Sequence, residues 1–261
     1  METCISRDGT RIAYDRVGEG TPVILIGGAL SHRSFPQFVE LSRLLSVRHT
    51  AIAYDRRGRG DSGDTAPYAV EREVEDVDAL IGAVGGSAHV WGWSSGAALA
   101  LRAAASGLGI EKLALYEPPY MVGNVGHRPP PDHEAKLREL VSAGRRSDAV
   151  KFFMVQMVGV PRLMVAIMRL MPFWKKLLVT AHTLPYDAAV MGDFSLPREM
   201  IASVRIPTLI AAGEKSPPVL RNAALAVAET LPGAGHMVLA GQSHNVSMKA
   251  LAPALLDFFA S

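Results

Sequence analysis

The amino-acid sequence predicts an α/β fold, with a mostly parallel central sheet flanked by helices and a helical cap inserted into it. Short apolar runs recur along the chain, and they lack the alternation of polar residues that a half-exposed strand shows. Segments with helical spacing of apolar residues separate these runs, as they do in proteins with parallel sheets. Between Pro118 and about Ile206 no such run occurs, and this stretch is rich in methionine.

The first two strands are expected to form a hairpin around Asp8-Gly9, a strong turn dipeptide. In chain order, the expected strands are residues 2–6, 11–17, 23–26, 50–55, 88–93, 112–117, 207–213 and 236–241. The expected helices are residues 36–46, 70–84, 95–105, 219–230 and 249–260. The helix over 70–84 has an apolar stripe with acidic residues opposite to it. These elements predict a core of residues 1–117 and 207–261 and a helical cap of residues 118–206.

Composition limits the classes of partner. The chain of 261 residues is 49% hydrophobic, and its net charge of +2 comes from 27 basic and 25 acidic residues. So small an excess gives no reason to expect a nucleic acid or an anionic membrane as partner. Cys4 is the one cysteine, so neither an intrachain disulfide nor a thiolate metal cluster is expected. No ligand cluster or phosphate-binding loop is recognised, and no metal or cofactor is therefore expected.

The sequence predicts a cytoplasmic protein. Its first residues carry charges and no continuous apolar segment, unlike a secretory signal. The longest apolar region, 152–174, is interrupted by polar residues, glycine and proline, and falls short of the roughly 18 uninterrupted apolar residues of a membrane span. Homo-oligomer formation is left open.

The segment Gly92-Trp93-Ser94-Ser95-Gly96 is the candidate nucleophile motif, because it matches G-x-S-x-G between a predicted buried strand and a predicted helix. A serine in so sharp a turn has a strained backbone, and larger neighbours than glycine would clash. The hydroxyl of Ser94 is thereby held out of the turn at the positive end of a helix.

Nearly the whole chain resembles the α/β-hydrolase family, in its serine-nucleophile, esterase- and lipase-like branch, and Ser94 falls on the nucleophile elbow of that family. A serine hydroxyl needs a general base. His244 follows the last predicted strand and precedes the last helix, which is where the family has its catalytic histidine. The resemblance implies that Ser94 and His244 are catalytic.

The third member of the triad departs from the family pattern. The family usually has an aspartate after the strand that is 207–213 here, and Ser216 stands where it is expected. Glu117, at the end of the preceding strand, is the favoured acid, because some relatives supply the acid from this position. Pro118 is expected to hold it extended. Glu214 and the absence of any acid are the alternatives.

The oxyanion hole needs two N–H donors, and Ser95 and Ala29 are the candidates. Ser95 follows the nucleophile, and Ala29 lies in the loop after strand 23–26 that serves this role in the family. The loop 54–62 resembles the family's D-x-R-G-x-G-x-S loop, whose role is to brace the site. The charges of its three arginines are expected to be balanced by the nearby carboxylates Asp55, Asp61 and Asp64.

The predicted function is hydrolysis of an ester or related acyl bond of a small, largely apolar molecule through an acyl-enzyme on Ser94. Seven methionines between Met121 and Met191, with several aromatic residues, indicate an apolar pocket under the cap. Other reactions of the same triad, namely C–C bond hydrolysis, lactone opening and cofactor-free perhydrolysis, are alternatives. A non-catalytic binding protein is the third hypothesis, because the usual aspartate is missing at Ser216.

Overall fold

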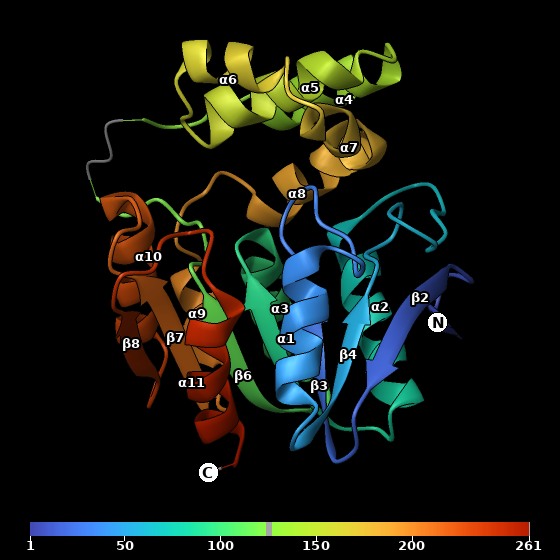
Figure 1. The fold of residues 1–261 in the computed structure, drawn as a ribbon, viewed down its shortest axis with the longest axis vertical. Coiled ribbons are helices and arrows are strands. Elements are labelled where there is room, and N and C mark those ends of the chain that lie inside the picture. Colours follow the sequence, from blue (N-terminus) through green and yellow to red (C-terminus); the bar gives the residue numbers. More distant parts are fainter. Residues whose placement is uncertain (124–126, 261) are drawn as a thin grey trace.

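The computed structural model describes residues 1–123 and 127–260. Within these residues, eight strands form one sheet in the order β1-β2-β4-β3-β5-β6-β7-β8 (Figure 1). The pairs β1–β2 and β2–β4 are antiparallel, and all other pairs are parallel. The strands are β1 (Glu2–Ile5), β2 (Arg11–Val17), β3 (Thr21–Ile26), β4 (His49–Tyr54), β5 (Ala88–Trp93), β6 (Ile110–Tyr116), β7 (Thr208–Gly213) and β8 (Gly235–Leu239). The predicted mostly parallel sheet is confirmed.

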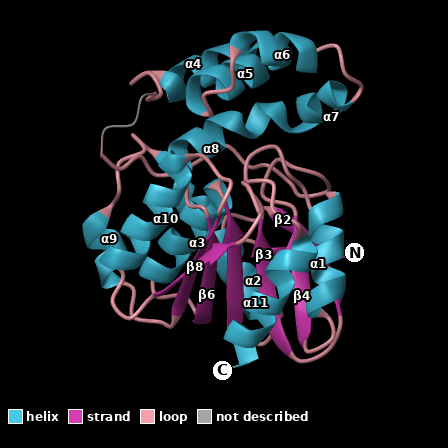
Figure 2. Cartoon of the chain, turned by 60° about the vertical axis from the view of Figure 1, so that its left-hand side comes forward, coloured by secondary structure: helices cyan, strands magenta, loops and turns pink. Residues whose placement is uncertain are grey.

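Helices cover both faces of the sheet (Figure 2). Alternate side chains of a strand point to opposite faces, and β3 accordingly contributes Val23 and Leu25 to one apolar cluster and Ile24 and Ile26 to the other. The first cluster includes side chains of α1 (Pro36–Leu45) and α11 (Met248–Ala260). The second includes side chains of α2 (Val70–Ala83), α3 (Ser95–Ala105) and α10 (Pro218–Thr230).

The chain between β6 and β7 forms helices, most of which lie beyond one end of the sheet, whereas the last of them, α9, packs beside α3 and α10 (Figure 1). They are α4 (His133–Ser142), α5 (Arg146–Phe152), η1 (Phe153–Met157), α6 (Arg162–Met168), α7 (Phe173–Thr180), η2 (Ala181–Thr183), α8 (Leu184–Met191) and α9 (Arg198–Ser203). We call residues 118–206 the cap, following the expected domain division, which stays a prediction. Residues 124–126 of the cap and Ser261 at the end of the core lie outside the described residues.

One expectation for α2 is wrong. Val77, Leu80 and Ile81 of its apolar stripe are buried, but Glu73 and Asp76 among the acids are buried as well. They are buried because arginines of the loop after β4 pair with them, Arg56 with Glu73 and Arg57 with Asp76. Ion pairing at short range makes burial of a carboxylate tolerable.

The topology brings the candidate site residues to one edge of the sheet. Ser94 follows β5, Glu117 follows β6 and His244 follows β8, and the loop with Ala29 follows β3. These four strands are parallel, so their carboxyl ends meet at the same edge. Ligand sites of open α/β sheets lie outside this edge, and here the cap lies over it (Figure 1).

Candidate active site

Ser94 occupies the tight bend between β5 and α3. Its backbone has φ 56° and ψ −124°, a conformation that residues with side chains rarely adopt. The Ser94 N–H donates to the carbonyl of Tyr116 on β6, at 3.0 Å, and its carbonyl accepts from the Ala97 N–H at 2.8 Å. These bonds hold the strained backbone in place from both sides.

Two glycines make this bend sterically feasible. A Cβ atom on Gly92 would lie 2.6 Å from the Gly96 carbonyl oxygen, and one on Gly96 would collide with the carbonyl oxygen of Ile26. Helix α3 can therefore start directly against β3 and β5. The glycines at both ends of the motif are required by packing, as the sequence predicted.

His244 and Glu117 are brought together, although they lie 127 positions apart in the chain. The His244 Nδ1–H donates to Oε2 of Glu117 at 2.6 Å. Oε1 of the same carboxylate accepts from the Gly213 N–H at 2.7 Å, and the Glu117 side chain is fully buried. A carboxylate in this position fixes both the tautomer and the orientation of the imidazole.

The conformation predicted for Glu117 is wrong. Pro118 was expected to keep it extended, but Glu117 has φ 49°, in the left-handed region. The backbone N–H of Glu117 is bonded to the Ala211 carbonyl of β7, while its side chain turns to Gly213 and His244. These bonds offset a conformational cost of roughly 1–2 kcal/mol.

The loop that carries His244 is tied to the residues that precede Ser94 and Glu117. The Trp93 indole N–H donates to the His244 carbonyl at 3.2 Å, and the Tyr116 hydroxyl donates to the Ser243 carbonyl at 2.7 Å. Trp93 and Tyr116 are themselves neighbours across β5 and β6. The two strand ends thus fix the position of the histidine loop relative to Ser94.

The other residues considered for the acid lie elsewhere. Oε2 of Glu214 accepts from the Gly241 N–H at 2.7 Å, and no contact between Glu214 and His244 occurs among the described residues. Ser216 is buried in the loop after β7. Of the two glutamates, the one that contacts His244 is therefore Glu117.

The two residues expected to form the oxyanion hole, Ala29 and Ser95, line the same cavity as Ser94. Ser95 is the first residue of α3, where N–H groups have no partner within the helix. The Gly28 carbonyl accepts from Arg59 Nη1 and from Ser31 Oγ, each at 2.7 Å. Since C=O and N–H point in opposite directions across a trans peptide, the Ala29 N–H points away from Arg59.

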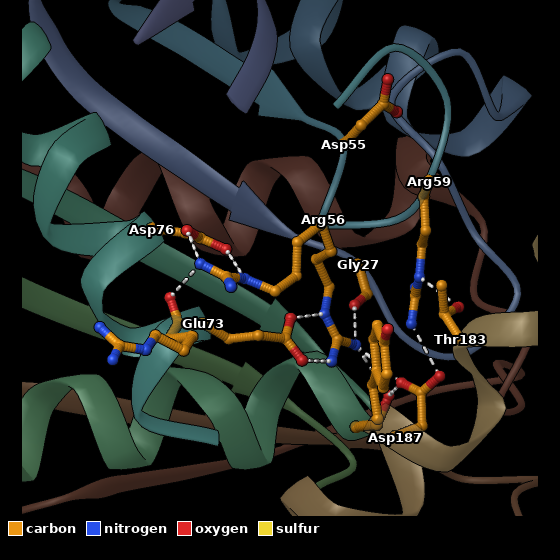
Figure 3. A network of polar contacts seen from close by, with 12 residues as sticks. Gly27, Asp55, Arg56, Arg59, Glu73, Asp76, Thr183 and Asp187 are labelled. Atoms are coloured by element: carbon orange, nitrogen blue, oxygen red, sulfur yellow. Dashed lines mark hydrogen bonds and ion pairs between the residues drawn. The ribbon is translucent and has the colours of Figure 1, made fainter. Parts of the chain in front are cut away.

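A buried ionic cluster contacts the loop that carries Ala29 (Figure 3). Arg56 makes a two-bond ion pair with Glu73, at 2.6 and 2.7 Å, and a third bond at 2.7 Å to Asp187 of the cap. The second oxygen of Asp187 accepts from Arg59 at 2.7 Å. Ser95 Oγ also donates to Asp187, at 2.8 Å. The Asp187 carboxylate thus links Arg56 and Arg59 to Ser95 at the start of α3.

Burial opposes the ionisation of Asp187, but Arg59 and Arg56 outweigh this effect and hold the pKa of its carboxyl below the ordinary value. The charge of Asp187 is therefore fixed at neutral pH.

The expected partners of the loop arginines are wrong. Asp55 and Asp61 pair with Arg33, which lies in the loop after β3. Asp64 accepts from the Tyr186 hydroxyl at 2.9 Å. Neighbours in sequence are not neighbours in this turn, since the side chains of Arg56 and Arg59 run inward to α2 and the cap while Asp55 faces the other way (Figure 3).

The cavity beneath the cap has a volume of about 480 Å³. Ser94, Ser95, Ala29 and His244 line it on the core side. Most of its wall is apolar and comes from Pro119, Met121, Phe153, Met157, Val158, Met191, Phe194, Pro217, Pro218, Val219 and Leu220. The cavity fits a small molecule with one polar group at the sheet edge and an apolar remainder.

Three polar residues of the cavity, Asp187, His127 and Asn222, were not anticipated. Asp187 lies in the largely apolar helix α8, and the absence of acids from 149 to 186 sets it apart in the sequence. His127 lines the cavity from the cap, with Nε2 2.7 Å from the Gln156 carbonyl. Among the described residues, no group of three or more histidine, cysteine or acidic side chains is arranged to hold a metal ion.

Comparisons with known proteins agree with this architecture. An alpha/beta hydrolase of known structure from Sphaerobacter thermophilus is 51% identical, with 99% of this chain and 100% of that chain aligned and a TM-score of 0.93. The structure of an esterase from Exiguobacterium antarcticum is similar in fold, with a TM-score of 0.76 at 21% identity and both chains fully covered.

The N-formylmaleamate deformylase of Pseudomonas putida is 36% identical over 120 residues, which is 44% of this chain and 44% of that enzyme. The match thus spans less than half of the curated relative's length. A model of the alpha/beta hydrolase family matches residues 23–247. The chain belongs to the alpha/beta hydrolase family.

Proposed function

We propose that this protein hydrolyses an ester or related acyl bond of a small, largely apolar substrate through an acyl-enzyme on Ser94. The observation that carries the proposal is that Ser94, in its strained bend, and His244, bonded to the buried Glu117, line one apolar cavity. Membership of a hydrolase family supports the same class of reaction.

In the proposed reaction, Ser94 Oγ attacks the carbonyl carbon of the substrate while Nε2 of His244 takes the hydroxyl proton. Glu117 stabilises the resulting imidazolium through Nδ1–H. The N–H groups of Ala29 and Ser95 donate to the oxyanion of the tetrahedral intermediate. When the intermediate collapses, the imidazolium gives its proton to the leaving alcohol, and the acyl group stays on Ser94.

Water completes the cycle. His244 removes a proton from the water molecule, whose oxygen attacks the acyl carbon, and the second tetrahedral intermediate uses the same two N–H groups. Collapse returns the proton to Ser94 Oγ and releases the carboxylic acid.

A fluorophosphonate probe tests the proposal directly, because it labels only an activated serine. We expect rapid labelling of the wild-type protein, no labelling of Ser94→Ala, and normal labelling of Ser106→Ala, which removes an exposed hydroxyl at the end of α3. If the wild-type protein is not labelled, the proposal fails in favour of a binding protein with this fold.

A substrate panel then separates the reactions that these groups could perform. Short apolar esters are expected to be the best substrates, and the panel adds a lactone, a vinylogous C–C cleavage substrate, an N-formyl amide, and peroxide with a carboxylic acid. The N-formyl amide is included because of the partial likeness to a deformylase. The protein can pass the labelling test and yet, without the probe, cleave the C–C substrate or the amide but no ester. That result would show that the proposed class of bond is wrong.

A further inference from the structure

The cap exposes an unusual number of apolar side chains. Of the 15 large hydrophobic residues exposed in the described part of the chain, eight lie between Val158 and Val179. Leu163 and Ile167 are one helical turn apart on α6, so they share a face, and Leu170 lies two residues beyond the end of α6. Leu163 is 75% exposed and Leu170 86% exposed. We call Leu163, Met164, Ile167, Leu170, Met171 and Phe173 the apolar ridge.

Cations border the apolar ridge. No aspartate or glutamate occurs from residue 149 to 186, while five lysines and arginines do. Two adjoining grooves, one beside α7 and one between α5 and α6, are lined by Arg145, Arg146, Lys151, Arg162, Arg169 and Lys175. The one acid that lines them in the described structure, Asp148, is paired with Arg145 at 2.9 Å.

The grooves and the ridge form one surface. Arg169 lines both grooves and directly precedes Leu170. Val179, which is exposed, lines the same groove as Lys175. Helix α6 lies on the side of the cap that faces away from the sheet (Figure 1).

We propose that this face of the cap docks on an anionic phospholipid surface, with the apolar ridge in the acyl boundary and the groove cations on lipid phosphates. A helical face of leucine, isoleucine and methionine beside lysine and arginine is the composition of a segment that lies in a membrane interface. The net negative charge of an anionic lipid surface complements the cationic grooves, whereas a zwitterionic surface has no net charge to do so. Among the described residues, no helix is long and apolar enough to cross a bilayer, so the docking is in the plane.

A second copy of the chain fits the face less well. In a two-fold dimer the same patch meets itself, and the grooves would then bring cations against cations. The net charge of +2 for the whole chain does not reveal this face, because acids elsewhere in the sequence cancel its charge.

The exposed segment that would dock also contributes to the wall of the cavity. Val158, which follows η1 and is exposed at the start of this segment, also lines the cavity that contains Ser94. An apolar substrate dissolved in the membrane could therefore reach the cavity along this segment.

Vesicle flotation tests the docking. We expect the protein to float with vesicles of phosphatidylcholine mixed with phosphatidylglycerol, and to bind vesicles of phosphatidylcholine alone at least tenfold more weakly. Raising the salt from 0.1 M to 1 M shortens the Debye length from about 10 Å to about 3 Å and should release the bound protein. Equal binding to both vesicle types, or none to either, would overturn the proposal.

Matched variants locate the surface. Arg169→Gln with Lys175→Gln, which removes two cations of one groove, should lower the partition coefficient roughly 30-fold, while Arg43→Gln with Lys249→Gln, which removes the same charge from exposed positions on α1 and α11, should not. Leu163→Gln with Leu170→Gln should lower it at least tenfold. Its control, Val39→Gln with Val47→Gln, changes residues that are 57% and 71% exposed on the core and should have no effect.

Two further measurements separate the other outcomes. Ser94→Ala should bind vesicles like the wild type, so failure of the proposed hydrolysis leaves the docking test intact. Sedimentation should give the same mass for the wild type and for Leu163→Gln with Leu170→Gln. A dimer that this double variant dissociates would show that the face is a self-interface and would refute the proposal.

Discussion

Two fully buried carboxylates contact residues of the candidate site, and their partners differ in kind. Glu117 contacts a backbone N–H and the imidazole of His244. Asp187 contacts the guanidinium groups of Arg56 and Arg59 and one hydroxyl. An imidazole changes its charge near neutral pH, whereas a guanidinium does not.

The two carboxylates therefore differ in role. The pair of Glu117 and His244 can respond to a change of charge, whereas Asp187 with Arg56 and Arg59 keeps its charges and forms what we call the fixed frame. Glu117 can stabilise a charge that comes and goes on its partner during proton transfer. Asp187 neutralises charges that are always present, so its contribution is the position of the loop with Gly28 and of the first turn of α3. Removing each carboxylate should therefore affect different measurements, namely turnover for Glu117 and stability for Asp187.

The largest effect is expected for Glu117→Gln. The amide oxygen can still accept from Gly213, so the fold is kept, but the carboxylate that stabilises the imidazolium is lost. By analogy with other serine triads, kcat for a small ester should fall about 10³- to 10⁴-fold. Steady-state kinetics, with the unfolding midpoint measured in parallel, checks this expectation.

Glu214→Gln is the matched control for that variant. Its carboxylate also accepts one backbone N–H, from Gly241, but it makes no described contact with His244. Its kcat should stay within about twofold of the wild type, an effect far below the loss of a catalytic contact. If the two variants lose activity equally, Glu117 does not act through the histidine.

A smaller effect, now on stability, is expected for Asp187→Asn. The substitution leaves the buried Arg59 without a carboxylate and Arg56 with Glu73 alone. Breaking a buried ion pair on one side costs about 3–5 kcal/mol of unfolding free energy, which urea denaturation measures. The exposed Asp193→Asn serves as the control, and equal stability of the two variants would contradict the idea of a fixed frame.

Variants of Arg57 and Arg59, which lie in the same loop, test whether the fixed frame positions the loop that carries Gly28 and Ala29. Arg59→Met removes the bond to the Gly28 carbonyl, while Arg57→Met breaks pairs with Asp76 and Asp8 that do not involve this loop. Both should be less stable, but only Arg59→Met should lower kcat, by about ten- to a hundredfold, with KM little changed. Equal values of kcat for the two variants would remove the proposed link to the oxyanion hole.

The smallest effect concerns pH. Because the pKa of Asp187 is lowered in the folded protein from its ordinary value of 3.8, its ionic contribution is complete above that value. The contribution declines as pH falls from 3.8 toward the folded pKa, by at most about 1.4 kcal/mol per pH unit. The stability difference between wild type and Asp187→Asn should thus be equal at pH 7 and pH 5 and shrink below pH 4. A difference that grows on acidification would show the opposite sign of shift.

The regular elements of the core were predictable because their evidence is local. Apolar runs of strand length and amphipathic helices follow from neighbouring residues, and β5 and α3 begin and end where the sequence indicated. The buried acids of α2 were not predictable in this way. Glu73 and Asp76 follow the periodicity of an exposed face, and only arginines from another loop explain their burial.

The sequence by itself determined the succession of core strands and helices along the chain, the tight bend at Ser94 and the histidine after the last strand. Tertiary structure alone decided which carboxylate contacts that histidine and which acids neutralise the loop arginines. The pair His244–Glu117 spans 127 positions and the pair Arg56–Asp187 spans 131. Local patterns carry no information about contacts at such separations, because these contacts form only when the sheet brings distant strand ends to one edge.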